Sequence, residues 1–149
     1  MWARILYTNR DWIETLIRII LGVVFFAHGA QKLLGWFGGA GLKNTMLTMH
    51  QFLRLPIPLA FLAIATEFFG GVGLIVGLLS RLAALGIAAT MVAAILMVHG
   101  RYGLFLNWFG DRKGHGFEYH LLAIALAAVI IARGAGALSL DRFLYTSLV

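Results

Sequence analysis

Long apolar stretches alternate with short polar ones along this chain, and four of the apolar stretches are long enough to form membrane helices. They cover approximately residues 12–34, 57–79, 82–99 and 117–137, and a transmembrane helix needs about 20 predominantly apolar residues. Pro56 and Pro58 stand at the start of the second stretch, where proline is tolerated because the first turn of a helix leaves its N–H groups unused. The pattern predicts an all-α membrane protein, a single domain over residues 1–149 that folds as a bundle of four transmembrane helices.

Residues 42–54, between the first and second stretches, follow a different pattern. Leu42, Met46, Met49 and Leu53 recur at helical spacing, and polar residues occupy much of the remaining helical wheel. This pattern is typical of a short amphipathic helix in the membrane interface, and a plain loop is the alternative. We therefore expect a short interfacial helix between spans one and two.

Composition supports the membrane assignment and excludes several other classes. The chain is 61% hydrophobic and 12% charged, whereas soluble domains average about 25% charged residues. Its net charge of +6 comes from basic residues scattered singly, without the basic patch of a nucleic-acid-binding protein, so we expect no nucleic-acid partner. The sequence contains no cysteine, which excludes disulfide exchange and covalent c-type haem attachment. We expect a multi-pass protein of the inner (plasma) membrane.

Glu67 is the most informative ionisable residue, because it falls near the middle of the second apolar stretch. A carboxyl group there either stays neutral or pairs with a cation, and Lys32 near the end of the first stretch is the candidate cation. His28 and Lys32 are related as i and i+4, so they share one helix face. We take Glu67, His28 and Lys32 as candidate catalytic residues, with histidine moving protons near neutral pH. Packing and snorkelling roles are the alternative.

A second group of residues falls at the same end of the helices. His99 ends the third stretch, while Glu118 and His120 begin the fourth. Glu118 and His120 are two positions apart, about 200° around a helix, so only one can fully face the centre. Together with the aromatic residues Trp36 and Trp108, they are our candidates for contacting a bound cofactor.

No motif predicts a metal or haem site. The Glu-x-x-His spacing of di-iron bundles is missing from the sequence. A metal site from His28, His99, His120 and Glu67, or a haem held by two of these histidines, has no diagnostic spacing to support it. His115 lies in a connecting segment, where we expect it to be solvated.

Arg18 and Arg133 lie near the other ends of their stretches, where we expect snorkelling towards the headgroups. Glu14 precedes Arg18 by four residues and is positioned to pair with it. Gly73 and Gly77 form a small-xxx-small pair, which predicts close approach of another helix.

Several motifs occur in a fixed order over nearly the whole chain: Arg18, Gly22, Phe26-x-His28-Gly29-x-x-Lys32, Gly38-Gly39, Glu67-x-x-Gly70-Gly71, Gly77-Leu-x-x-Arg81 and Gly134-Ala-Gly136-Ala-Leu-Ser139-Leu140-Asp141. In order and spacing they resemble the DoxX family of small membrane proteins. The resemblance implies a four-helix membrane fold. Because relatives are implicated in membrane thiosulfate:quinone oxidoreductases and in oxidative-stress or thiol-redox complexes, it also implies a redox-associated membrane subunit.

Two functional interpretations follow. In the first, the chain interacts with quinone within a larger membrane oxidoreductase complex, and a partner subunit or bound cofactor carries the electrons. In the second, it is a non-catalytic assembly or anchoring protein whose polar residues specify helix packing, or a protein that handles lipids or small solutes. The many small residues are also compatible with a homo-oligomer.

Overall fold

The computed structural model describes residues 5–148, so residues 1–4 and 149 lie outside it. Within the described range the secondary structure is helical and includes no strand, which confirms the all-α prediction. The helices are α2 (Trp12–Leu33), α3 (Gly41–Leu53), α4 (Ile57–Val76), α5 (Ser80–Ala94), α6 (Glu118–Arg133) and α7 (Leu140–Leu148). Shorter 3-10 or π turns adjoin them: η1 (Trp36–Gly38), η2 (Ile95–His99) and η3 (Gly100–Tyr102).

Three helical segments are long and apolar enough to cross a membrane: α2, α4 and the run from Ser80 to Tyr102 that joins α5 to η2 and η3. The fourth expected span is shorter than predicted. Helix α6 has 16 residues, about 24 Å at 1.5 Å per residue, compared with roughly 30 Å of hydrocarbon. It ends at Arg133 rather than near residue 137, because Gly134 leaves the helical region with a φ of 97°. Similarly, α4 ends at Val76 rather than near residue 79, at the left-handed Gly77.

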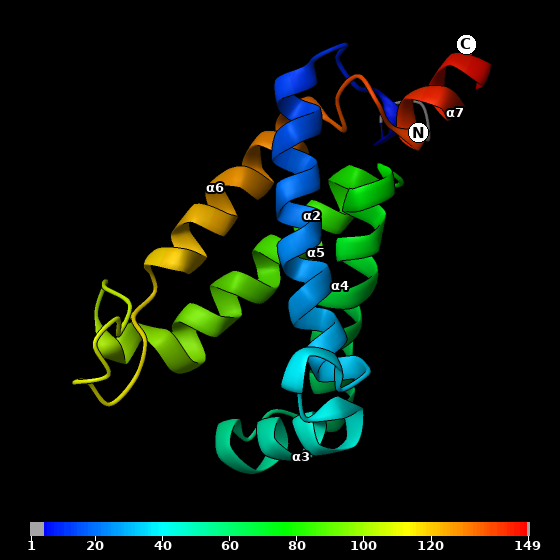
Figure 1. Cartoon of the computed structure of the whole chain (residues 1–149). Helices are drawn as coiled ribbons and strands as arrows, with labels where there is room; N and C mark the ends of the chain where they lie inside the picture. Colours follow the sequence, from blue (N-terminus) through cyan, green and yellow to red (C-terminus); the bar gives the residue numbers. More distant parts are fainter. Residues whose placement is uncertain (1–4, 149) are drawn as a thin grey trace.

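The helices pack as two pairs that diverge towards one end of the molecule. Helix α2 packs along α4, α5 packs along α6, and contacts between α4 and α5 join the pairs. Figure 1 shows the pairs separating towards the end that carries α3, with α7 at the opposite end. Residues 41–53 are a helix, as their amphipathic pattern predicts, and this helix contacts α4 and α2.

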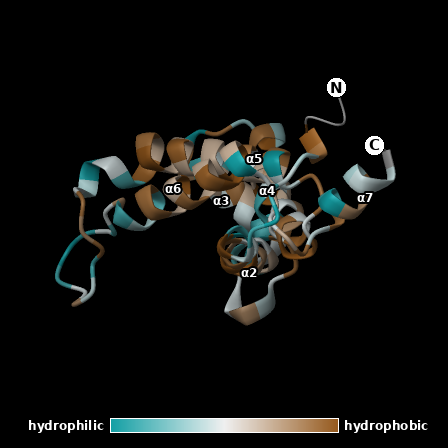
Figure 2. Ribbon diagram, turned by 90° about the horizontal axis from the view of Figure 1, so that it is seen from above, coloured by the Kyte–Doolittle hydropathy of each residue, from teal (hydrophilic) through white to brown (hydrophobic). Residues whose placement is uncertain are grey.

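The outward surface of the long helices is strongly apolar. Trp12, Leu96 and Leu122 are 69%, 80% and 67% exposed. Figure 2 shows hydrophobic residues around these helices and many polar residues in a connecting loop and in α7. Helices that are apolar on their outer as well as their inner surfaces are typical of membrane spans.

Glycines bring the backbones of α2 and α4 into direct contact. A Cβ atom built on Gly29 would lie 2.4 Å from the backbone nitrogen of Phe68, and one on Gly71 would lie 2.4 Å from that of Phe26. Both distances are far below van der Waals contact, so only glycine fits. This is the small-residue packing expected between membrane helices.

The predicted contact through Gly73 and Gly77 is wrong. Gly77 ends α4 and lies against Ser139, which precedes α7. A Cβ on Gly73 would lie 3.0 Å from the carbonyl oxygen of Leu78 in the following turn, and it would meet another helix only at Ala83, at an ordinary 3.8 Å. The close helix contact lies on another face of α4, because periodicity alone does not identify which glycine row faces a neighbouring helix.

Arg18 is buried and does not snorkel, which corrects the sequence-based expectation. Its guanidinium, 1% exposed, donates to the carbonyls of Leu74 and Ile75 in the last turn of α4 and to those of Ala135 and Leu138. The last four carbonyls of a helix have no partner within it, and a cation is favourable at that end of the helix dipole. Arg18 therefore caps the C-terminus of a neighbouring helix.

Two more charged residues cap neighbouring helices at the same end of the molecule. Arg81 donates to the carbonyls of Ile131 and Ala132 near the end of α6. Asp141 accepts hydrogen bonds from the backbone nitrogens of Leu79 at 2.6 Å and Ser80 at 2.9 Å, where α5 begins. These caps replace the water that would satisfy helix ends in a soluble protein.

Glu14 pairs with Arg133 rather than with Arg18 as expected from the i, i+4 spacing. The carboxylate is buried, whereas the side chain of Arg133 is 56% exposed. The partner therefore comes from the end of α6 because the guanidinium of Arg18 is directed towards the backbone carbonyls of α4 and the 134–139 segment.

Candidate functional site

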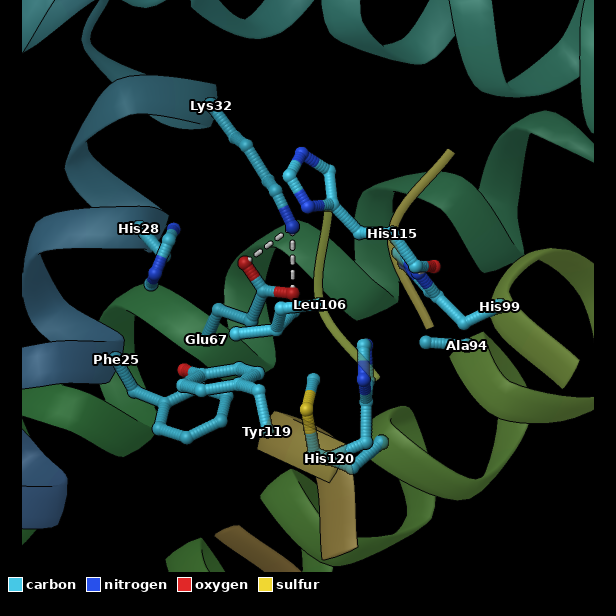
Figure 3. Close-up of a pocket in the computed structure, with 11 residues that line it drawn as sticks. Phe25, His28, Lys32, Glu67, Ala94, His99, Leu106, His115, Tyr119 and His120 are labelled. Carbon is cyan, nitrogen blue, oxygen red and sulfur yellow. Dashed lines mark hydrogen bonds and ion pairs between the residues drawn. The ribbon is translucent and has the colours of Figure 1, made fainter. Parts of the chain in front are cut away.

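A cavity of about 380 Å³ lies between the two helix pairs at the end where they diverge. Its polar lining includes His28, Lys32, Glu67, His99, His115 and His120, and its apolar lining includes Phe25, Met91, Ala94 and Leu106. Figure 3 shows these side chains converging from α2, α4, the end of α5, the following loop and α6. The structure thus brings together five of the eight site residues proposed from the sequence: His28, Lys32, Glu67, His99 and His120.

Lys32 and Glu67 form an ion pair across the cavity wall (Figure 3). The ammonium nitrogen lies 2.6 Å from each carboxylate oxygen. The Glu67 side chain is only 3% exposed, whereas that of Lys32 is 30% exposed and faces the cavity. Pairing reduces the large cost of burying either charge alone. The candidate cation inferred from the sequence therefore lies beside Glu67.

Gly29 explains how Lys32 reaches Glu67. A Cβ atom on Gly29 would lie 2.5 Å from the Cα of Phe68 and 2.8 Å from the carbonyl carbon of Glu67. The backbone of α2 therefore lies directly on α4 less than one turn before Lys32. The His28-Gly29-x-x-Lys32 motif combines this close approach with the two polar side chains that line the cavity.

His99 and His120 stack against each other on the α5–α6 side of the cavity. Their ring centroids are 4.2 Å apart, and His120 is 6% exposed. The Nδ1 of His99 donates to the carbonyl of His115 at 2.8 Å. Since a carbonyl only accepts, this contact requires a proton on Nδ1, and in the corresponding tautomer Nε2 is the hydrogen-bond acceptor.

His99 lies at the end of the π turn η2. Such wide turns are rare and are often found at functional sites. A π turn changes which way the following side chains point relative to a regular helix, and here His99 contacts His120. No sequence pattern indicated this turn.

Tyr119 is a cavity residue that sequence reasoning missed. Its ring lies nearly parallel to that of Phe25, with centroids 6.5 Å apart, and 6.0 Å from the ring of His28. The Tyr119 hydroxyl and the Nδ1 of His120 are buried without hydrogen-bond partners among the described residues. The sequence offered no signal for Tyr119, since adjacent residues such as Tyr119 and His120 point about 100° apart on a helix.

The other three proposed cofactor contacts lie outside the cavity lining. Glu118 accepts a hydrogen bond from the backbone nitrogen of Leu106 at 2.9 Å. Of Glu118 and His120, it is therefore His120 that faces the cavity. Trp36 packs edge-on against Phe26, and Trp108 is 77% exposed on a loop.

His115 was expected to be solvated. It is exposed, yet it also lines the cavity. In the region covered by the structure, no three acidic, histidine or cysteine side chains converge as they would around a metal ion.

The fold and the cavity define a helical membrane protein with a polar site enclosed between apolar spans. The chain belongs to the DoxX family, whose model matches residues 13–100. It is also similar to a protein of Bacillus subtilis (strain 168) named "Putative oxidoreductase CatD", with 29% identity over 130 residues, or 87% of this chain and 85% of that protein. No solved structure matches the chain significantly.

Proposed function

We propose that this DoxX protein binds a quinone headgroup in the cavity and exchanges protons with it, as a subunit of a larger membrane oxidoreductase complex. The observation that carries the proposal is the Lys32–Glu67 pair at the wall of a partly apolar cavity. The name of the Bacillus relative also points to redox chemistry. Because the chain has no cysteine, electrons would come from a partner subunit or a bound cofactor.

The lining suits a neutral planar ring with polar oxygens. A volume of about 380 Å³ falls within the roughly 300–1,000 Å³ of typical small-molecule pockets. Lys32 is the sole lysine or arginine among the lining residues, and Glu67 neutralises it, so the site favours a neutral ligand over an anion. The partnerless Tyr119 hydroxyl and His120 nitrogen are polar groups that a ligand oxygen would satisfy after small rotations.

The side chains divide into two groups suited to proton exchange. Lys32 would donate a hydrogen bond to a ligand oxygen, while Glu67 and His28 accept or return a proton. His99 and His120 offer basic nitrogens on the opposite wall. A quinone bound between them would supply the two-electron, two-proton chemistry.

We place the protein in the plasma membrane as four spans, with α6 as a short fourth span and α3 in the interface. The start of α2 and helix α7 lie at one end of the helices (Figure 1), as an even number of crossings requires. The apolar outer surface of α6, including Leu122 at 67% exposure, supports lipid contact. Local thinning of the bilayer accommodates a short span at modest cost.

Photoaffinity labelling of the full-length protein with an azido-quinone tests the proposal. We expect labelled peptides from α2 and α6, competition by unlabelled quinone, and weaker labelling in Glu67→Gln and His28→Ala. Asp111→Asn and His50→Ala are the matched controls because both residues are exposed and neither lines the cavity. Unchanged labelling in folded Glu67→Gln and His28→Ala proteins would refute the assignment.

Glycine-mediated packing favours a second candidate, a non-catalytic assembly or anchoring protein. The contacts at Gly29 and Gly71 would then serve only to hold the helices for a partner subunit. This candidate predicts that Glu67→Gln reduces stability or partner binding without a separate loss of quinone reduction in the assembled complex. Purification from the native membrane in mild detergent, with mass spectrometry of bound proteins and quinones, separates the two candidates.

A further inference from the structure

The loop between η3 and α6 carries large apolar side chains that nothing in the described chain covers. Phe105, Trp108 and Phe109 are 59%, 77% and 93% exposed. Figures 1 and 2 show this loop extending beyond the ends of α5 and α6, away from α2 and α4. Trp108 and Phe109 do not line the cavity, so their exposure needs another explanation.

The tip of the loop is held in a defined turn. The side-chain amide of Asn107 donates to the carbonyl of Arg112 at 2.8 Å and accepts from its backbone nitrogen at 3.2 Å. The backbone nitrogen of Asn107 also donates to Nδ1 of His115 at 3.2 Å. These bonds close the turn with Trp108 and Phe109 outside it, so the apolar tip is formed before any partner binds, which reduces the entropy lost on binding.

The charges around the tip are mainly positive. Arg101, Arg112 and Lys113 are exposed, whereas Asp111 is the sole acidic residue between residues 100 and 116. Tryptophan is enriched at membrane–water interfaces, and basic side chains within a Debye length are attracted to anionic lipids. The apolar tip and basic flanks together match an anionic membrane surface better than water.

We propose that residues 101–113 form an anchor for anionic phospholipid, in which Trp108 and Phe109 enter the interface and the three basic side chains contact lipid phosphates. The position of the loop beyond the ends of α5 and α6 supports this partner (Figures 1 and 2), because the ends of membrane helices are where tryptophan meets the headgroups. Leu106 and His115, which line the cavity, belong to or adjoin the same loop. Anchoring of the tip therefore also fixes one wall of the cavity.

The test uses the full-length protein with Trp108 as its sole tryptophan, through Trp2→Phe, Trp12→Phe and Trp36→Phe. It is placed in nanodiscs of phosphatidylcholine with or without phosphatidylglycerol, and the acyl chains carry bromine near the headgroups or near the bilayer centre. We expect stronger quenching of Trp108 fluorescence by the shallow bromines and weak quenching by aqueous acrylamide. Quenching by acrylamide without quenching by bromine would overturn the proposal and leave the tip available to a soluble protein.

Energy transfer from Trp108 to dansyl-labelled lipids tests the charge component separately. We expect transfer to labelled phosphatidylglycerol to exceed transfer to labelled phosphatidylcholine by about fivefold, the enrichment that one basic residue near an anionic surface provides. Arg112→Gln with Lys113→Gln should reduce that preference, while Arg10→Gln with Lys43→Gln, outside this loop, should preserve it. Equal transfer to both lipids in the parent protein would contradict an anionic-lipid anchor, even if shallow quenching were observed.

Discussion

Replacing Arg18 by methionine should destabilise the protein severely without changing the shape of the core much. Methionine is also long and unbranched, but it cannot donate hydrogen bonds. The guanidinium of Arg18 serves four carbonyls, including Leu74 and Ile75 at the end of α4. In the variant these acceptors would lie in an apolar interior without a donor.

The magnitude follows from the number and kind of bonds lost. A buried polar group left without a partner costs about 1–3 kcal/mol. Removing the charge also relieves part of the desolvation cost that the buried guanidinium imposes, so the individual losses do not simply add. Asp141, the carboxylate that caps α5, would meanwhile lose a nearby cation. We expect a net loss of about 3–5 kcal/mol.

Unfolding by dodecyl sulfate in mixed micelles, followed by circular dichroism, measures this loss. Arg10→Met is the matched control because Arg10 is exposed. Arg18→Lys should fall between the parent and Arg18→Met, since one ammonium keeps the charge but cannot reach all the separated carbonyls. If Arg18→Met lost less than about 1 kcal/mol, the typical value of a single hydrogen bond, the capping argument would be wrong.

Three further predictions test other contacts. Gly29→Ala should lower the free energy of unfolding by about 1–3 kcal/mol, because the added methyl group overpacks α2 against α4. Gly70→Ala is the control and should be tolerated, because its Cβ would lie 3.5 Å from the nearest side chain. Equal losses of stability for the two variants in micelle unfolding would argue against the glycine contact. Arg81→Met should speed hydrogen exchange at the end of α6, and unchanged exchange there would show that this arginine is not a cap. Lys32→Met should lower the free energy of unfolding by about 3–5 kcal/mol, because it leaves Glu67 unpaired. Adding Glu67→Gln to this variant should recover part of that loss. If the losses of the two single variants were additive in this double-mutant cycle, the pair would not be coupled.

Three of the four predicted spans and the ion pair were accessible to sequence reasoning because each has a local signal. Length and hydropathy identify the spans. A lone carboxylate within a span, such as Glu67, requires a partner, and few basic residues in the other spans could provide one. The amphipathic pattern of residues 42–54 likewise predicted the helix α3.

The orientation of side chains relative to neighbouring helices could not be predicted from the sequence in the same way. Arg18 looks like a snorkelling residue because the sequence does not show that the end of α4 lies beside it. The π turn before His99 has no compositional signature, and without it the rotation of His99 relative to His120 cannot be inferred. Trp108 was placed at the cofactor because it shares an end of the helices with the cavity, but a shared membrane depth does not imply a shared direction.

The two ends of the molecule differ in how their polar groups are arranged. At the end near α7, Arg18, Arg81 and Asp141 satisfy helix termini with charged side chains from neighbouring segments, and the helix pairs lie close together (Figure 1). At the other end the pairs diverge, and the polar groups there include an ion pair and two buried atoms without partners. Buried side-chain atoms without partners in the described part of the chain also occur near α7, where Glu14 Oε2, Ser80 Oγ and Arg81 Nε lack them, so it is the divergence of the helix pairs that opens the cavity. The capping network thus holds the helices together at one end by bonds to their backbone, and the separation of the pairs at the other end leaves space for a polar cavity that holds Lys32 against Glu67.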